Sequence, residues 1–167
     1  MEFYDTVRNR RSIRGYKKRA VPSESLARIK EAVQLAPTAC NLQPFKFLLA
    51  ESKGIREQIC QFYPQPWLAE APVIVVALGN RSEAWKRLNG SSAHVIDVSI
   101  AMEHFVLASS AEGLATCWIC AFDQEAMHSA LELSADWDVV AITPLGYADA
   151  EPRPLSRKSL EKLFSTV

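Results

Sequence analysis

The sequence predicts an α+β fold in which helices cover a central β-sheet. Three observations support this: helical and strand patterns alternate, residues 72–79 (PVIVVALG) form an unbroken β-branched run, and residues 93–113 are apolar on nearly all sides. Such a strand is typical of a sheet buried on both faces, and such a helix is typical of a core. The 167 residues, 49% of them hydrophobic, suffice for one buried core, so we expect a single domain over residues 1–167.

The N-terminal half predicts three helices and a strand. Residues 3–8 (FYDTVR) indicate a short opening helix, and residues 21–37 carry apolar side chains at helical spacing up to Pro37, which ends the helix. Residues 45–51 (FKFLLAE) then predict a strand, and residues 54–63 (GIREQICQFY) predict another helix. This alternation is expected where helices pack on a sheet.

The C-terminal half continues the alternation. The long apolar helix is expected to end at Gly113, and residues 114–120 (LATCWIC) predict a strand. Asp123 is a suitable N-cap for a following helix, and residues 137–147 (WDVVAITPLGY) predict the last strand. Residues 149–164 form a tail that is rich in proline and basic residues.

Composition favours a soluble cytoplasmic protein without membrane contact. No N-terminal apolar run resembles a signal peptide, and the apolar stretch 95–111 is interrupted by acidic and histidine side chains. The four cysteines are too irregularly placed for a disulfide framework, and the three histidines lack paired ligand spacing with them. No metal site is therefore expected from Cys40, Cys60, Cys117, Cys120, His94, His104 and His128.

Residues 8–19, RNRRSIRGYKKR, hold seven cations in twelve positions, although the net charge of the chain is zero. The segment fits a solvated surface loop, a nucleic-acid patch or a clamp for a small anion. A pI of about 6.8 disfavours nucleic acid as a partner, because nucleic-acid-binding domains carry a marked basic excess. Arg10, Arg11 and Arg14 surround Ser12, and guanidinium groups with a small hydroxyl suit the oxygens of a phosphate.

A second segment, residues 36–45 (APTACNLQPF), places Thr38, Asn41 and Gln43 between two prolines. Taken alone, it fits an ordinary connection from a helix to a strand. Together, RRSIR and this segment resemble the nitroreductase family of flavin enzymes. The N-terminal pattern of that family is R-R-S-x-R, followed after one helix by A-P-S-x-x-N-x-Q-P-W.

The resemblance continues through most of the chain. It includes an apolar strand after an A-P pair (AEAPVIVVA), a long helix that begins with aspartate (DVSIAMEHFVLASSAEGL), the segment GLATCWI, and L-G-Y before a basic tail. Four positions depart from the pattern: Thr38 and Ala39 stand where serines are common, Phe45 replaces a tryptophan and Ala115 replaces a glycine. These departures concern the shape of the substrate pocket more than cofactor binding.

The resemblance implies both a fold and an activity. The fold is nitroreductase-like, α+β, with a central mixed β-sheet between helices in three layers, α/β/α. The activity is that of an FMN-dependent oxidoreductase, which transfers hydride from NADH or NADPH to a nitroaromatic, quinone or enone by a ping-pong mechanism. FMN would lie at the interface of a homodimer. Because the flavin carries the chemistry, no catalytic acid or base is assigned.

The resemblance also implies which residues bind FMN. A cation near the ring stabilises the negative charge of reduced flavin, and this role is assigned to Arg14. The phosphate is assigned to Arg10 and Ser12, with Arg157 or Lys158 of the tail, and Arg11 shares that role or lies along the ribityl chain. Backbone contacts near N5 of the ring are assigned to Trp118, Ile119, Cys120 and Ala121.

The partner subunit is expected to contribute a loop to the same cofactor. Its residues would be Pro37, Thr38, Ala39 and Asn41, with Asn41 and Gln43 as orienting groups. The link between residues 80 and 94 is too short for an extra helical insertion over the pocket. Candidates for the wall of the substrate pocket are therefore Tyr63, Trp67 and Trp85, although each also fits as a core or surface aromatic.

Two alternatives remain. One is a flavin-binding module without turnover. The other is a thiol-disulfide oxidoreductase, because Cys117 and Cys120 have the C-x-x-C spacing of redox pairs. Residues three apart in a strand point to opposite faces, so the strand prediction instead makes Cys117 a small core residue.

Overall fold

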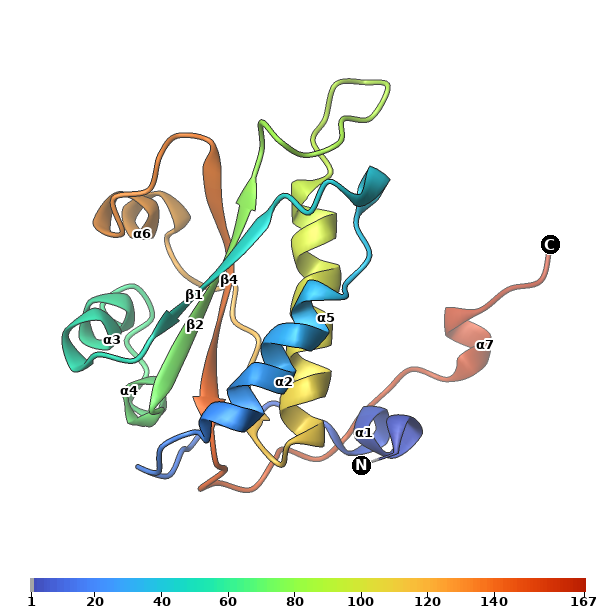
Figure 1. The fold of residues 1–167 in the computed structure, drawn as a ribbon. Coiled ribbons are helices and arrows are strands. Elements are labelled where there is room, and N and C mark those ends of the chain that lie inside the picture. Colours follow the sequence, from blue (N-terminus) through green and yellow to red (C-terminus); the bar gives the residue numbers. More distant parts are fainter. Residues whose placement is uncertain (1) are drawn as a thin grey trace.

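The computed structural model of the chain describes residues 2–167 and is built around a four-stranded sheet. The strands lie in the order β1-β2-β4-β3, and each neighbouring pair is antiparallel (Figure 1). A parallel bridge joins Ser12 to Thr116, so the mixed character expected of the sheet rests on this bridge. The strands are β1 (Phe45–Ala50), β2 (Val73–Asn80), β3 (Ala115–Thr116) and β4 (Trp137–Gly146).

Helices cover both faces of the sheet and confirm the three-layer arrangement. Figure 1 shows α2 and α5 on one face and α3, α4 and α6 on the other. The helices of these layers are α2 (Ser23–Gln34), α3 (Lys53–Cys60), α4 (Pro66–Glu70), α5 (His94–Ala111) and α6 (Gln124–Ala130). Three short helical segments lie outside the layers: α1 (Phe3–Asn9), the 3-10 turn η1 (Ala39–Asn41) and α7 (Leu160–Leu163).

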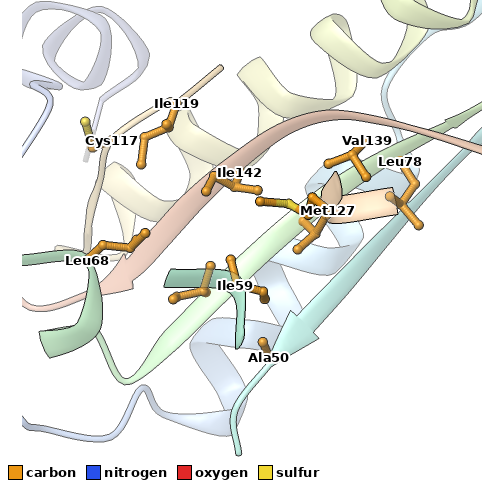
Figure 2. Packing of buried hydrophobic residues seen from close by; sticks show 11 residues of the cluster. Ala50, Ile59, Leu68, Leu78, Cys117, Ile119, Met127, Val139 and Ile142 are labelled. Carbon is orange, nitrogen blue, oxygen red and sulfur yellow. The ribbon is translucent and has the colours of Figure 1, made fainter. Parts of the chain in front are cut away.

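The unbroken apolar run of β2 is explained by the two layers. Alternate side chains of a strand point to opposite faces, so each face of β2 enters a different core. Ile74, Val76 and Leu78 pack in the core toward α3, α4 and α6. Figure 2 shows Leu78 in this core, with Ile59 of α3, Leu68 of α4 and Met127 of α6. Val73 and Val75 pack in the core toward α2 and α5. Burial of each such side chain contributes about 1.5–3 kcal/mol to the free energy of folding.

The predicted helix ends are confirmed at two positions. Gly113 follows α5 with a φ of 72°, a left-handed conformation that glycine adopts without strain. The Asp123 carboxylate accepts a hydrogen bond from the Ala126 amide at 3.0 Å and caps α6. No helix in the described chain is long and apolar enough to cross a membrane.

The strand expected over residues 114–120 is only partly formed, which corrects that prediction. β3 ends at Thr116, and pairing with β4 resumes as an isolated bridge between Ile119 and Ile142 in the same register. Proline has no amide hydrogen to donate, and Pro144 lies opposite the break. The Cys117 amide instead donates to the Thr143 hydroxyl at 3.2 Å. The short helices α4 and α7 were not predicted, because neither is long enough to show a helical period.

Candidate functional site

The basic N-terminal segment and the C-terminal tail lie side by side at the edge of the sheet. The Ile13 amide donates to the Thr116 carbonyl at 3.0 Å, which ties the segment to β3. The Asp149 amide donates to the Gly15 carbonyl at 2.9 Å, which ties the start of the tail to the same segment. Backbone hydrogen bonds therefore bring together two basic regions that are far apart in the sequence.

Where these regions meet, they line a cavity of about 140 Å³, here named the arginine cavity. No carboxylate lies among its described lining residues, and none of its five arginines forms an ion pair within residues 2–167. Uncompensated guanidinium groups attract a multiply charged anion, and their planar forks fit phosphate oxygens. The polar lining consists of Arg10, Arg11, Ser12, Arg14, Arg153 and Arg157.

Arg11 is held differently from its neighbours. Its Nη1 donates to the backbone carbonyls of Arg8 (2.5 Å) and Arg10 (2.8 Å), so its guanidinium is fixed against the chain. Within the described residues, the guanidinium groups of Arg10 and Arg14 make no comparable hydrogen bond, which leaves both available to an anion.

The tail contributes one expected residue to the arginine cavity and one unexpected residue. Arg157 lines it, whereas Lys158 is exposed and does not. Arg153 also lines the cavity and was missed by the sequence prediction. Its signal was the basic character of the whole tail, which could not indicate which cations fold back onto the N-terminal segment.

The loop at residues 37–43 is strained and lies elsewhere in the molecule. Cys40, Asn41 and Gln43 have φ values of 51°, 54° and 53°, a left-handed region that is unfavourable for residues with a side chain. The Thr38 hydroxyl accepts from the Gln43 amide at 3.0 Å, and Gln43 Nε2 donates to Asn41 Oδ1 at 3.2 Å. The predicted orienting groups therefore bond to each other on an exposed loop.

Asp97 holds this loop against α5. Its Oδ1 accepts from the Ala39 amide at 2.9 Å, and the residue is only 1% exposed. The other carboxylate oxygen, Oδ2, is buried without a hydrogen-bond partner within the described residues. A buried, half-satisfied carboxylate costs free energy, so it must be held by the packing around it. Asp97 was quoted in the sequence pattern but received no role there.

The loop that contains η1 and the N-terminal segment that follows α1 lie at opposite ends of α5 (Figure 1). Asp97 is in the first turn of α5, whereas the Ser12–Thr116 bridge lies just beyond its last turn. A helix of this length, 18 residues, spans roughly 27 Å. One chain therefore does not bring these two predicted halves of the site together.

The segment Trp118–Ala121 begins two residues after Thr116, which forms a bridge with Ser12 of the arginine cavity. Trp118 packs toward α5, Ile119 is buried in the opposite core, and Cys120 and Ala121 are exposed. Trp118 Nε1 donates to the Cys120 sulfur at 3.1 Å. The last two residues of the segment are thus open to solvent.

Cys117 and Cys120 do not form a redox pair in this structure. Cys117 is 3% exposed and belongs to the core toward α3, α4 and α6, whereas Cys120 is exposed. Burial raises the pKa of the Cys117 thiol, although Arg14 opposes this shift. A raised pKa disfavours the reactive thiolate, so the geometry does not support the thiol-disulfide alternative.

The three predicted pocket aromatics are not brought together. Tyr63 and Trp67 meet edge to face at 5.9 Å and pack against the core toward α3, α4 and α6. Trp85 is 40% exposed in the loop before α5. Their role in a substrate pocket stays a prediction. Within residues 2–167, no group of three or more acidic, histidine or cysteine side chains is arranged to hold a metal ion.

The α/β/α fold and a cavity lined by five arginines at the sheet edge are the features to compare with known proteins. The nitroreductase family model matches residues 7–62 and 56–147, and the chain belongs to this family. It is 30% identical to an NADH dehydrogenase from Thermus thermophilus, over 92% of this chain and 90% of that protein. It is 27% identical to an FMN reductase [NAD(P)H] from Bacillus subtilis, over 68% of this chain and 46% of that protein.

Solved structures agree with this assignment. A nitroreductase family protein from Clostridium difficile 630 has a TM-score of 0.90 and 26% identity, covering 99% of this chain and 98% of that one. Another from Clostridium novyi NT has a TM-score of 0.83 and 33% identity, covering 89% and 86%. The predicted fold and enzyme class are confirmed: the protein is an NAD(P)H-dependent flavin oxidoreductase, with FMN as its cofactor.

Proposed function

We propose that the protein binds the FMN phosphate in the arginine cavity and passes hydride from NADH or NADPH to a small electron-poor acceptor. The acceptor class is a nitroaromatic, quinone or enone, and the two half-reactions follow a ping-pong order. The observation that carries this proposal is the arginine cavity itself, where five arginines converge without a lining carboxylate in the described chain. A phosphate dianion would compensate that charge.

The cavity residues divide the work of holding the cofactor. Arg10, Ser12 and Arg157 bind the phosphate oxygens. Arg11 is already hydrogen-bonded to the backbone, and it shares the phosphate or lies along the ribityl chain. Lys158 lies beside Arg157 in the chain and is the alternative tail contact. The guanidinium of Arg14, which forms no ion pair within the described residues, would lie toward the ring and would stabilise negative charge at N1 and the C2 oxygen.

Bound FMN supplies the hydride acceptor at N5, and the protein orients that ring. The backbone of Trp118–Ala121 follows the Ser12–Thr116 bridge closely in the chain, which supports its assignment as the segment that would donate a hydrogen bond near N5. Trp118 packs toward α5, and this packing would restrict the motion of the segment. A contact through backbone groups leaves the stacking face of the ring open to nicotinamide and acceptor in turn.

The proposed site is completed by a second copy of the chain. The loop of Pro37, Thr38, Ala39 and Asn41 lies an α5 length from the arginine cavity of its own chain, so it serves the cavity of the partner. Exposed apolar side chains near that loop supply surface for a two-fold interface; they are Leu35, Leu42, Val95 and Ile96. We expect this homodimer to be obligate for flavin binding.

An absorbance spectrum followed by anaerobic titration with NADH and NADPH tests this function. We expect a yellow protein whose flavin bleaches with either nucleotide and recovers on addition of a quinone or nitroaromatic. A protein that retains FMN but is reduced by neither nucleotide would favour the flavin-binding module without turnover.

A further inference from the structure

The basic segment at residues 8–19 serves two cavities, and only one of them has been assigned a ligand. Arg10, Arg11 and Arg14 line the arginine cavity, whereas Lys18 and Arg19 line a separate cavity of about 480 Å³ between the end of the segment and helices α3 and α4. We name it the α3–α4 pocket. Its charged lining consists of Lys18, Arg19, Lys53, Arg56, Glu57 and Glu70.

A buried residue, Tyr16, lies in the basic segment between the residues that line the two cavities. Tyr16 is 2% exposed, and its hydroxyl donates to the Ile13 carbonyl at 2.7 Å. Its amide donates to Glu70 Oε2 at 3.4 Å, on the side of the α3–α4 pocket. The two cavities share no lining residue. The α3–α4 pocket is therefore not an extension of the proposed flavin site.

The positive charge of this pocket is poorly compensated. Its two carboxylates are already engaged: Glu57 pairs with Lys53 at 3.6 Å, and Glu70 accepts from the Tyr16 amide. Neither Lys18 nor Arg56 forms an ion pair within residues 2–167. Four cations against two carboxylates leave a net charge of two positive units.

Two of the cations are held in place before any ligand arrives. Arg56 is half-buried, and its Nη1 donates to the Ala71 carbonyl at 2.6 Å, while its Nε is buried without a partner in the described chain. The Arg19 guanidinium lies 4.1 Å from the centre of the Tyr147 ring. A guanidinium that is already ordered loses less entropy on binding an anion, so these two groups favour a fixed pose.

We propose that the α3–α4 pocket is a second anion site and that it takes a phosphorylated small molecule. Its volume lies in the range of small-molecule sites, roughly 300–1,000 Å³. Its net charge matches a phosphate monoester dianion or a pyrophosphate. Glu57 and Glu70 on its rim would repel a continuous phosphate backbone, and the neutral chain as a whole argues against nucleic acid.

Calorimetric titration of the FMN-loaded protein with pyrophosphate, and separately with AMP, tests the proposal. Loading with FMN occupies the proposed phosphate site, and charge variants of the α3–α4 pocket distinguish binding there from binding at the nucleotide site over the flavin. We expect saturable binding that weakens about tenfold or more in the double variant Lys18→Gln/Lys53→Gln, because two charged contacts are lost. Both lysines are exposed, so this variant should fold even where Arg56→Gln does not. Lys86→Gln, an exposed cation before α5, is the matched control and should leave binding unchanged.

Four results would overturn the proposal. The first is no saturable binding of either probe by wild type at millimolar concentration. The second is an equal loss in the control variant. The third is a rise in free-flavin fluorescence that accompanies the heat and shows displacement of FMN from the arginine cavity. The fourth is binding to phosphatidylglycerol vesicles that is lost in Lys18→Gln/Lys53→Gln while neither probe binds, which would assign the charge to a lipid surface. Each result leaves the proposed flavin chemistry untouched, because bleaching by NADH or NADPH is measured independently.

Discussion

The two ends of α5 differ in almost every physical respect. Its C-terminal end is followed by β3, which pairs with the N-terminal segment of the arginine cavity, where cations from two chain segments converge and backbone hydrogen bonds hold both segments. Its N-terminal end carries a loop without charged side chains, in which Cys40, Asn41 and Gln43 have left-handed backbone conformations. The first end concentrates charge, and the second stores strain.

This difference indicates two separate tasks in cofactor binding. A cationic cradle supplies affinity for a phosphate, and it can do so within one chain. A strained loop without charged side chains determines the shape of the site. Its left-handed backbone conformation persists only because the hydrogen bond to Asp97 and the surrounding packing hold it. Since both ends of one helix cannot reach the same ligand, the proposal requires two chains for each site.

Removal of charge at the cavity end should have the largest effect. Arg10→Ala should weaken FMN binding by roughly 10- to 100-fold, because a charged hydrogen bond to phosphate contributes about 1.5–3 kcal/mol. The turnover of fully loaded enzyme should change little, since the phosphate interaction is the same in ground and transition states. Fluorescence titration of apoprotein with FMN measures the affinity. Arg8→Ala is the control, since Arg8 lies outside the cavity lining; equal affinities in the two variants would refute the phosphate assignment.

Release of the strain at the other end should have the next largest effect. Asp97→Ala removes the acceptor for the Ala39 amide and should weaken FMN binding by about tenfold, the consequence of one lost hydrogen bond to a charged group. Asp97→Asn keeps an oxygen acceptor and should recover most of the affinity. Hydrogen exchange at residues 38–43 should rise in Asp97→Ala alone. Unchanged exchange in that variant would show that Asp97 does not hold the loop.

Loss of the Arg14 cation should change the reduction potential of the bound flavin more than the affinity for FMN. Arg14→Ala should lower the two-electron midpoint potential of bound flavin by about 30 mV, which corresponds to about 1.4 kcal/mol less stabilisation of the reduced form. Potentiometric titration of the variant and of Arg8→Ala measures this shift. A potential equal to wild type, with weaker FMN binding instead, would move Arg14 to the phosphate group of residues.

The smallest expected effect concerns how the cavity end of α5 is fastened to α2. Arg28 binds Glu112 through two hydrogen bonds of 2.7 and 2.6 Å, and these lower the pKa of Glu112 from 4.5 to about 2. A lowered pKa means that the stabilisation is present above the ordinary pKa and is lost as the pH falls from about 4.5 to about 2. The Arg28 side chain is 59% exposed and that of Glu112 is 19% exposed, so water and salt screen the pair and its contribution to stability is small.

Urea unfolding of wild type and Arg28→Gln as a function of pH measures that contribution. The difference in unfolding free energy should be present at pH 7 and should shrink on acidification. Lys30→Gln, on the same helix, controls for general loss of positive charge. A difference in unfolding free energy that grows as the pH falls would contradict a lowered pKa for Glu112.

Much of the fold could be predicted from local patterns. The unbroken run of β2 is a consequence of burial on both faces of the sheet, and it is visible in the sequence. The apolar character of α5 is also visible in the sequence, although Val95 and Ile96 of that helix are exposed. The break in the strand at Cys117 could not be predicted from its own residues, because its cause is Pro144 on the neighbouring strand. Residues that pair in space act on each other without any sequence period to reveal them.

The same reasoning applies to the candidate site. RRSIR is a local signal, and the structure gathers Arg10, Arg11, Ser12 and Arg14 around one cavity. Arg153 and Asp97 escaped prediction for a different reason. Each acts through a partner that is remote in sequence, and a lone arginine in a basic tail or a lone aspartate in an apolar helix carries no spacing that indicates this.

Mixed dimers test the shared site most directly. One chain carries Arg10→Ala and the other carries Thr38→Ala/Asn41→Ala, and differential tags isolate the mixed species. If each site takes its cavity from one chain and its loop from the other, one site in the mixed dimer has both defects and its twin has neither. The account predicts about one FMN per mixed dimer with wild-type affinity, reducible by NADH or NADPH, although each parent dimer binds weakly. A mixed dimer with no wild-type site would contradict it.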